Sequence, residues 1–453
     1  MKYLPINYGN KLKLIKCHLV NKDVFQADTA QIEVKWKILG RIPLDSKICY
    51  YFTDGQTKTI TFIDTEKPLK GKNIFYSQMC IGESFDDVID IKIPSNIKPG
   101  KYEISAFVFS SGNFESKGGI ASNVWPGQKV IKTFEVKLQT DLKKKFSIYK
   151  NSERSAFFDA MIDFWEKTPS FKTNPNIDMW ADFAFTTNVR GSKAIKILKK
   201  YINIENKSFL DIGCAYCGFL VAAKLEGARF VEGVDIDKQL IDLGVCNLKD
   251  YSVDAKVTTG DILDGKYVFE RNNLYDAITC NDVIEHVLDP ELAIKNIAFM
   301  LRERGVSLFE IPNMNHPSFV IKDGHFSIFA ITLLEREDAL EYSRDSYKVD
   351  YSPVGFYKEL DFYKSCFNKC GLEFAIDEST TVGVEADKIV QDVNFIKENF
   401  NSLIERVDSK HKALVVRRVK KYLDDFNLNQ QRMSSQKFLL YYGPAFWTVV
   451  GRK

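Results

Sequence analysis

Apolar and polar residues alternate along the first 140 residues, which is the spacing of strands with one buried face. Turn-forming residues separate several of these stretches, for example at Lys98–Gly100 and Ser110–Gly112. The pattern predicts seven short strands, at Lys11–Val20, Gln31–Leu39, Ile48–Phe52, Thr59–Ile63, Val88–Ile93, Tyr102–Phe109 and Val130–Val136. Short strands at such spacing indicate an antiparallel β-sandwich over residues 1–140.

The pattern changes after a predicted linker at 141–150, which carries the lysine run Lys143–Lys145. Apolar residues first recur at helical spacing, and strands and helices then alternate. Strands are predicted at Phe209–Ile212, Phe230–Val234, Lys256–Thr259, Ala277–Cys280 and Val306–Ile311, with helices near Phe219–Glu226, Lys238–Leu248 and Pro290–Leu301. This alternation predicts a second domain over 151–453, of the doubly wound α/β class with a mostly parallel sheet.

Two segments interrupt the alternation and are expected to be insertions, near 330–358 and 386–436. The second has helical spacing, and it carries a basic stripe that suits phosphate groups or, equally, forms a solvated helix face. The basic residues are Lys410, Lys412, Arg417, Arg418, Lys420 and Lys421. The last stretch, Phe438–Gly451, reads as strand-like and is expected to close the sheet as an antiparallel hairpin.

Composition excludes several classes of protein. The 453 residues carry a net charge of only +3, which argues against a dedicated nucleic-acid binder. Nine scattered cysteines, an odd number, predict reduced thiols and a cytoplasmic protein rather than a disulfide framework. Neither a signal peptide nor an apolar run long enough to span a membrane is found in the sequence.

Small residues follow the first α/β strand, at Gly213, Ala215 and Gly218, where a tight turn lets the backbone approach a ligand. Acidic residues follow the next two strands, in the pairs Asp235-Ile236 and Asp261-Ile262. An acid after the second strand is suited to bind the hydroxyls of a ribose, and one after the third to accept an adenine amino group. Asp237, just before a helix, is predicted to be its N-cap.

Together with Tyr275–Val287 and Leu301–Gly305, these motifs resemble the class I S-adenosylmethionine-dependent methyltransferases, over about 191–378 plus the final strand pair. The resemblance implies a seven-stranded sheet and S-adenosylmethionine as cofactor. It also implies cofactor-binding positions, with Asp211 on the amino group, Asp235 on the ribose and Asp261 on adenine. Gly213, Ala215, Gly218, Ile236, Ile262 and Asn281 would complete the pocket. Ala215 stands where the family usually has glycine, and its methyl group is expected to weaken cofactor affinity.

Asp282, Glu285 and His286 follow the fourth strand at spacing i, i+3, i+4, which places them on one face of a helical turn. His325 follows the fifth strand. Two carboxylates and two imidazoles suit a divalent metal such as Mg, Mn, Zn or Fe. The spacing is similar to that of ubiquinone-pathway O-methyltransferases and small-RNA 2′-O-methyltransferases, in which the metal polarises the hydroxyl being methylated. Two alternatives stay open: a metal-free general base, His286 or His325 aided by Asp282, and a structural role.

The N-terminal strands resemble β-sandwich modules appended to surface-polysaccharide enzymes. Aromatic residues there, such as Tyr50 and Trp125, would stack on sugar rings if exposed, or else pack in the core. Tyr351, Phe356 and Tyr357 are further candidates, either for the wall of a substrate pocket or for the core. The expected function is O-methylation of a sugar in a surface glycan or its precursor. RNA 2′-O-methylation and a non-catalytic glycan-binding scaffold are the alternatives, and the oligomeric state stays open.

Overall fold

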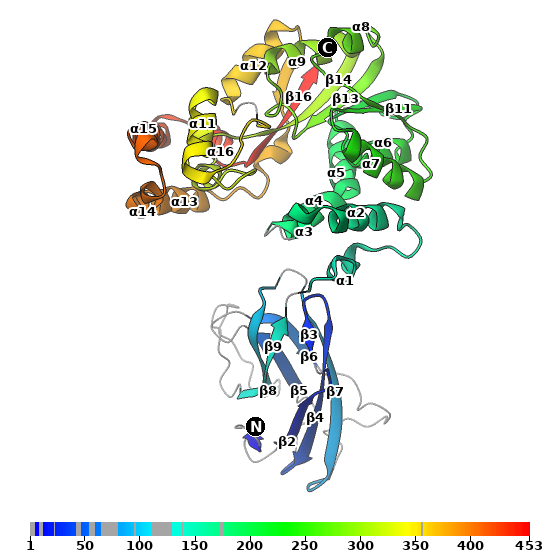
Figure 1. Ribbon diagram of the computed structural model, residues 1–453, viewed down its shortest axis with the longest axis vertical. Coiled ribbons are helices and arrows are strands. Elements are labelled where there is room, and N and C mark those ends of the chain that lie inside the picture. Colours follow the sequence, from blue (N-terminus) through cyan, green and yellow to red (C-terminus); the bar gives the residue numbers. More distant parts are fainter. Residues whose placement is uncertain are drawn as a thin grey trace. The chain divides into compact units, whose positions relative to one another are not determined.

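The chain was analysed as a computed structural model, shown in Figure 1. It describes residues 5–8, 12–21, 23–41, 47–53, 59–64, 80–94, 97–109, 129–137, 139–172, 176–354 and 357–453. The chain divides into two compact units, one formed by residues 1–152 and 161–182 and the other by residues 153–160 and 183–453.

The first unit is rich in strands, which form two sheets. One sheet has the order β1 (Ile6–Tyr8), β2 (Leu12–Leu19), β4 (Thr29–Ile38), β7 (Ser84–Lys92). The other has the order β3 (Val24–Phe25), β9 (Lys129–Lys137), β8 (Gly100–Phe109), β5 (Lys47–Thr53), β6 (Thr59–Asp64). All the described pairings are antiparallel except that of β3 with β9, which the sequence pattern did not indicate.

Buried side chains from both sheets form one hydrophobic core in this unit. Trp36 of β4 and Tyr50 of β5 are fully buried there, and the Trp36 indole donates a 3.1 Å hydrogen bond to the Tyr50 hydroxyl. Tyr50 is therefore a core residue, and it has no exposed ring on which a sugar could stack. Trp125 lies outside the described residues.

Four short helical segments follow the strands. They are α1 (Leu142–Lys145), α2 (Ala156–Lys167), α3 (Pro169–Lys172) and α4 (Ile177–Phe185). The segment predicted as a linker contains α1, because the Asp141 carboxylate accepts a hydrogen bond from the Lys144 backbone and caps the helix.

The second unit is built on one seven-stranded sheet, which confirms the expected doubly wound α/β class. Its order is β12 (Lys256–Thr259), β11 (Phe230–Asp235), β10 (Ser208–Ile212), β13 (Tyr275–Asn281), β14 (Leu301–Pro312), β16 (Phe446–Arg452), β15 (Glu373–Ile376). The first five are parallel, and β16 runs antiparallel to both β14 and β15. The carboxyl ends of the parallel strands therefore meet at one edge, where ligands bind in such sheets.

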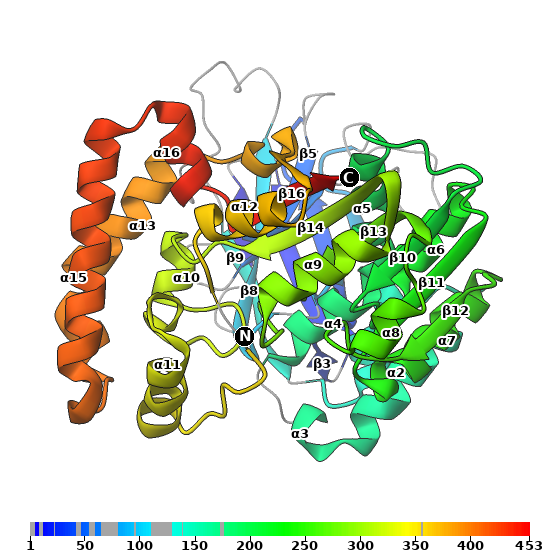
Figure 2. The same ribbon diagram turned by 90° about the horizontal axis from the view of Figure 1, so that it is seen from above.

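Helices cover both faces of this sheet (Figure 2). One face packs against α5 (Thr187–Leu198), α6 (Gly218–Leu225) and α7 (Lys238–Asp250). The other packs against α8 (Gly265–Phe269), α9 (Pro290–Met300) and α12 (Leu360–Lys369). A Cβ atom at Gly191 would lie 2.5 Å from the Gly218 carbonyl oxygen, so these two glycines permit the close contact between α5 and α6.

Further helices form a separate hydrophobic core beyond the sheet. They are α10 (Pro317–Ile321), α11 (Arg336–Tyr342), α13 (Ala386–Glu398), α14 (Phe400–Glu405), α15 (Ser409–Arg432) and α16 (Ser435–Tyr442). In Figure 1 the orange and red members, α13 to α16, gather at one edge of the unit. The predicted helical spacing of 386–436 matches α13 to α15.

The expected C-terminal hairpin over Phe438–Gly451 is wrong in its first half. Residues up to Tyr442 belong to α16, because Ser434 caps this helix and the i, i+4 pair Phe438 and Tyr442 is buried. The helix ends before Gly443-Pro444, and only the following residues form a strand. The antiparallel partners of β16 are the distant strands β14 and β15.

Candidate active site

The turn between β10 and α6 has left-handed backbone conformations at three positions. The φ angles are +71° at Gly213, +36° at Ala215 and +59° at Cys217. A Cβ atom at Gly213 would lie 2.2 Å from a methyl carbon of Val283, so this position accepts only glycine without rearrangement. Ala215 is strained, since a positive φ costs a non-glycine residue about 1–2 kcal/mol. The structure thus shows a physical reason why glycine is the easier residue at 215.

Asp235 ends β11 and ties this turn to the next one. Its carboxylate accepts hydrogen bonds from the backbone N–H of Ala215, at 2.9 Å, and of Asp237, at 2.8 Å. Burial raises the pKa of Asp235, although these hydrogen bonds oppose the shift. The prediction for Asp237 is confirmed, because its side chain accepts from the backbone of Gln239 and Leu240 and caps α7.

Asp211, in β10, is almost fully buried. It accepts a 2.6 Å hydrogen bond from the Thr279 hydroxyl, on the neighbouring strand β13. Burial raises the pKa of Asp211 to about 7, and the nearby Asp235 contributes in the same direction. A cationic ligand stabilises the ionised form of such a buried carboxyl group, because it supplies the compensating charge that the protein interior lacks.

The remaining predicted cofactor residues lie at the ends of the neighbouring strands. Asp261 is exposed after β12 and accepts from the backbone N–H of Leu263. Ile262 is buried, whereas Ile236, beside Asp235, is 73% exposed. Asn281 ends β13, and its side-chain oxygen is buried without a hydrogen-bond partner. An exposed apolar side chain and an orphaned polar atom at this edge are both features of a ligand site.

Two charged residues that the sequence did not single out face the same region. Arg190, on α5, lies 3.7 Å from the Asp282 carboxylate, and its buried Nε has no partner. Glu310, in β14, accepts from the Asn281 amide at 3.3 Å, and burial raises its pKa to about 7. Glu310 could have been noticed as the one charged residue in the predicted strand Val306–Ile311. Arg190 carries no such signal, because charged residues are ordinary on an amphipathic helix.

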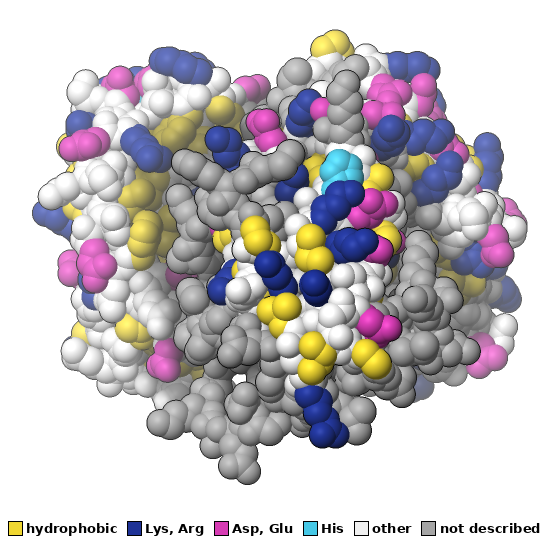
Figure 3. Space-filling view, turned by 90° about the horizontal axis from the view of Figure 1, so that it is seen from below, with side chains coloured by type: hydrophobic (Ala, Val, Ile, Leu, Met, Phe, Trp, Pro, Cys, Tyr) yellow, Lys and Arg dark blue, Asp and Glu magenta, His cyan; other side chains and the backbone are white. Residues whose placement is uncertain are grey.

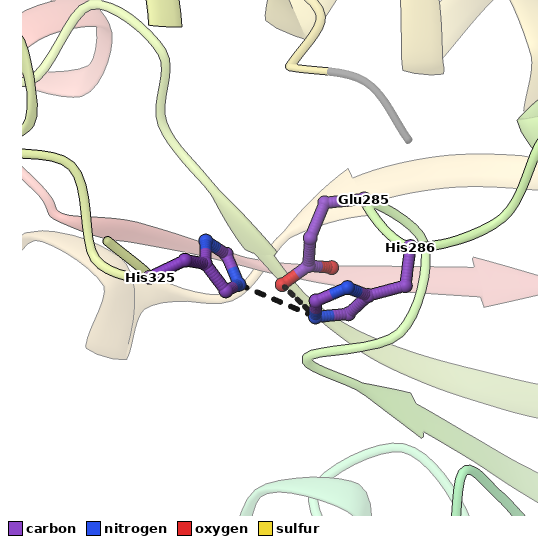
Figure 4. Close-up of side chains that lie close together, drawn as sticks. All are labelled: Glu285, His286 and His325. Carbon is purple, nitrogen blue, oxygen red and sulfur yellow. Dashed lines mark hydrogen bonds and ion pairs between the residues drawn. The ribbon is translucent and has the colours of Figure 1, made fainter. Parts of the chain in front are cut away.

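The loop after β13 does not form the helical turn that the i, i+3, i+4 spacing indicated. Residues 282–287 form turns, and Asp282 has a positive φ of +54°. Consequently Asp282 is directed to Arg190, whereas Glu285 and His286 meet His325 (Figure 4). In the part of the chain that the structure describes, the structure joins these three, and not Asp282, in one potential ligand cluster.

Short contacts define the cluster. The Nε2 atoms of His286 and His325 are 3.3 Å apart, and a Glu285 carboxylate oxygen lies 3.9 Å from His286 Nε2. His286 Nδ1 is 2.8 Å from the Pro353 carbonyl oxygen. Because a carbonyl only accepts hydrogen bonds, His286 carries its proton on Nδ1 and, when neutral, a lone pair on Nε2.

Burial controls the charges of this cluster. Glu285 is fully buried, which raises its pKa well above the usual range, and the carboxyl group of Asp282 adds to this effect. Burial lowers the pKa of His325 to about 4, with a further contribution from His286. Without a ligand, the cluster therefore favours a neutral imidazole at 325 and a protonated carboxyl group at 285.

The residues of the cluster fit a divalent ion. Two ligand nitrogens on a tetrahedral ion, each about 2.0–2.1 Å from the metal, are separated by roughly 3.3 Å, which matches the observed distance between the two Nε2 atoms. The second carboxylate oxygen of Glu285 is buried without a hydrogen-bond partner. The donor set of two imidazoles and one carboxylate suits Zn, Fe or Mn better than Mg, which prefers oxygen ligands.

Three of the six residues in the predicted basic stripe of α15 form ion pairs with acidic residues. Lys410 pairs with Glu341 and Asp345, Arg418 with Glu335, and Lys421 with Asp425. These ion pairs favour a solvated helix face over a phosphate-binding stripe. Figure 3 shows another face of the molecule, on which lysine and arginine side chains are interspersed with acidic and hydrophobic ones.

This chain is similar in sequence to known methyltransferases. A family model described as a methyltransferase domain matches residues 188–374. The ubiquinone biosynthesis O-methyltransferase of Coxiella burnetii is 24% identical over 231 residues, which cover 51% of this chain and 92% of the relative. The enzyme of the same name from Hydrogenovibrio crunogenus is 28% identical over 127 residues, 28% of this chain and 52% of the relative.

Solved structures to which this chain is similar include an S-adenosylmethionine-dependent methyltransferase from Mesorhizobium loti, with 13% identity and a TM-score of 0.34 over 58% of this chain and 98% of that one. Another is a phosphoethanolamine N-methyltransferase of Haemonchus contortus in complex with S-adenosylhomocysteine, with 15% identity and a TM-score of 0.35 over 62% of this chain and 59% of that one.

Among the helices of the described residues, none combines the length and apolar character needed to cross a bilayer.

The sheet order, the glycine turn with its acidic partners and the family match agree with one another. The chain contains a class I S-adenosylmethionine-dependent methyltransferase domain.

Proposed function

We propose that this methyltransferase transfers the methyl group to an oxygen atom, on a sugar of a surface glycan or of its precursor. The observation that supports the choice of oxygen is the Glu285, His286 and His325 cluster, which comes from the segments that follow β13 and β14. A hydroxyl is a poor nucleophile at neutral pH, so its methylation needs a group that takes or weakens its proton.

The cofactor site would use the chain's own carboxylates and turns. Asp235 would bind the ribose, Asp261 the adenine and Asp211 the amino group, while the backbone at Gly213, Ala215 and Gly218 leaves room for the cofactor. Ile236, which is 73% exposed, offers an apolar surface for the adenine ring. Arg190 supplies a cation with an unpaired Nε, suited to a carboxylate. S-adenosylmethionine carries sulfonium and ammonium charges that compensate the buried acids.

The histidine cluster would remove the proton. His286 keeps the proton on Nδ1 through the Pro353 carbonyl, so its Nε2 lone pair is free to accept the acceptor's proton. A divalent ion held by Glu285, His286 and His325 would supply Lewis acidity, which lowers the pKa of a bound hydroxyl. Asp282 would not be one of these ligands. It pairs with Arg190 and would influence the reaction only through the charge of that arginine.

The strand-rich N-terminal unit supports a glycan acceptor, because we interpret it as a β-sandwich module of the kind appended to surface-polysaccharide enzymes. The two sheets share one core, which agrees with such a module. RNA 2′-O-methylation is the second candidate, and the ion-paired basic residues of α15 argue against it. The retained carboxylates at 211, 235 and 261 argue against a non-catalytic scaffold. The odd number of scattered cysteines supports a reducing, cytoplasmic location.

The test uses S-adenosylmethionine labelled in its methyl group, with polysaccharide, lipid-linked sugar, RNA and protein fractions as acceptors. We expect label in a glycan fraction, and loss of that label after chelation with recovery on adding Zn, Fe or Mn. Label in RNA would replace the proposed acceptor. Turnover that survives exhaustive chelation would remove the metal and leave His286 as a metal-free base.

A further inference from the structure

His325 is held by a chain of side chains that extends away from the cofactor strands. Its Nδ1 lies 2.8 Å from the Tyr357 hydroxyl. The Tyr357 hydroxyl interacts with that of Tyr351, and the Tyr351 hydroxyl donates to a carboxylate oxygen of Asp323 at 3.2 Å. This series of side chains therefore runs from the His325 imidazole through the two tyrosine phenols to the Asp323 carboxylate.

Asp323 anchors this chain and the His325 loop together. Its side chain is completely buried and accepts from the backbone N–H groups of His325, Phe326 and Ile328, at 2.6 to 3.3 Å. An ionised carboxylate only accepts hydrogen bonds, so it fixes the direction of the Tyr351 hydroxyl. Tyr351 can then accept a hydrogen bond from Tyr357, which in turn can accept one from His325 Nδ1.

Two proton arrangements compete at His325, and each makes the same number of hydrogen bonds. In the first, Nδ1–H donates to Tyr357, Tyr357 to Tyr351, and Tyr351 to Asp323, so that the lone pair of His325 Nε2 faces that of His286. In the second, His325 Nε2–H donates to His286, and Tyr357 donates to Nδ1. Only the first leaves both Nε2 atoms, 3.3 Å apart, available to one metal ion.

We propose that Tyr357, supported by Tyr351 and Asp323, is a positioning residue that makes the metal-binding tautomer of His325 accessible. Without the Tyr357 hydroxyl, the remaining acceptor near the buried Nδ1–H is the Asp323 carboxylate, which at 3.8 Å lies beyond hydrogen-bond distance, so the competing tautomer becomes more favourable. Partners of this kind orient metal-binding histidines, and their loss typically costs about 10- to 100-fold in metal affinity. The inference rests on the proposed metal site.

A small cavity lies next to the side chains of Tyr351 and Tyr357. Its volume is about 20 Å³, enough for a single water molecule. Tyr351 and Tyr357 both line it, next to Glu335, Arg336 and Lys358.

The test measures binding of Co²⁺ alone to the full chain, because the visible absorption of Co²⁺ reports both affinity and coordination geometry. We expect Tyr357→Phe to weaken Co²⁺ binding by about 10- to 100-fold. Tyr351→Phe should weaken it less, since it leaves the direct partner of His325 in place. Binding of S-adenosylhomocysteine, which uses the other strand ends, should be unchanged in both variants.

The matched control is Tyr342→Phe. Tyr342 is fully buried in the same hydrophobic core, and its hydroxyl donates to the Phe329 carbonyl oxygen at 2.9 Å rather than to His286 or His325. This variant should bind Co²⁺ as the wild type does. Equal weakening in Tyr342→Phe and Tyr357→Phe would show a general loosening of the core and would overturn the proposal.

The outcomes separate this inference from the proposed function. Wild-type affinity for Co²⁺ in Tyr357→Phe overturns the positioning role and leaves the metal site standing. No Co²⁺ binding by the wild type, together with normal binding of S-adenosylhomocysteine, overturns the metal site and this inference with it.

Discussion

The two halves of the candidate site are built in different ways. The cofactor half consists of strand ends and the turns that follow them, and Asp235 holds it together by accepting from two backbone N–H groups. The half that we propose removes the proton joins His286 to His325, 39 residues apart in the sequence, through side chains and the Pro353 carbonyl. Backbone contacts fix the first half locally, whereas the second depends on packing of the segment that follows β14.

This difference predicts that the two functions can be separated by single substitutions. The largest effect is expected for His286→Ala, which removes the Nε2 lone pair. Loss of a general base or of a ligand at this position should lower methyl transfer by about 100- to 10,000-fold. His18→Ala, the same substitution at an exposed histidine of β2, is the control and should leave the rate unchanged. A wild-type rate in His286→Ala would exclude this histidine from the reaction.

On the cofactor side, Asp235→Ala should weaken S-adenosylmethionine binding by about 100-fold or more. The substitution removes both the ribose acceptor and the hydrogen bonds that shape the turn, each worth about 1.5–3 kcal/mol for a charged acceptor. Asp237→Ala is the matched control two residues on. It removes only the cap of α7, costs about 1 kcal/mol of stability and should bind the cofactor within a few-fold of wild type. Equal affinity in the two variants would contradict the assignment of Asp235.

The pKa of Asp211, raised to about 7, predicts a pH dependence of cofactor binding. For an acid whose pKa is raised by folding, the ligand-free protein loses stability as the pH rises from about 4 toward 7. A cationic ligand favours the ionised form, so affinity should increase over the same interval and fall by about tenfold from pH 8 to pH 6.

The variants Asp211→Asn and Glu310→Gln identify the group responsible, because the pKa of Glu310 is also raised to about 7. Titration calorimetry should show a flat profile for Asp211→Asn and a retained slope for Glu310→Gln. The reverse pattern would assign the pH dependence to Glu310.

The smallest effect concerns the scaffold beneath the cofactor turn. A Cβ atom at Gly218 would lie 2.5 Å from the Thr187 carbonyl oxygen, so Gly218→Ala should destabilise the unit by about 1–3 kcal/mol. Gly265→Ala, where nothing lies within 4 Å of the added methyl, should be neutral or slightly stabilising. Urea unfolding of both variants measures the difference, and similar midpoints would refute the close-contact argument.

The same contrast explains what the sequence could predict. The β10 turn, Asp235 and the Asp237 cap were identifiable because their chemistry is local, a strand followed by a turn and a helix start. The structure brings together three of the four residues predicted as metal ligands, Glu285, His286 and His325. Asp282 was expected to join them, but the left-handed backbone at 282 directs the side chain to Arg190. The expectation that Asp282, Glu285 and His286 share one face required a helical turn, which the loop after β13 does not form.

Partners supplied by distant segments carried no signal. Tyr357 was a candidate for a pocket wall or for the core, whereas the structure shows its hydroxyl on His325. Pro353 contributes only a backbone carbonyl, which no residue pattern reveals. Similarly, α16 reads as a strand because its apolar residues are also compatible with alternation, and the Ser434 cap decides in favour of a helix. Phe356 lies outside the described residues.

The most direct test of the division of labour is a calorimetric titration of S-adenosylmethionine into the wild type and into His286→Ala. The account predicts one binding site of equal affinity in both proteins, while methyl transfer is lost in the variant alone. Loss of binding in His286→Ala would show that the histidine cluster and the cofactor turns form one inseparable site, and would contradict the account.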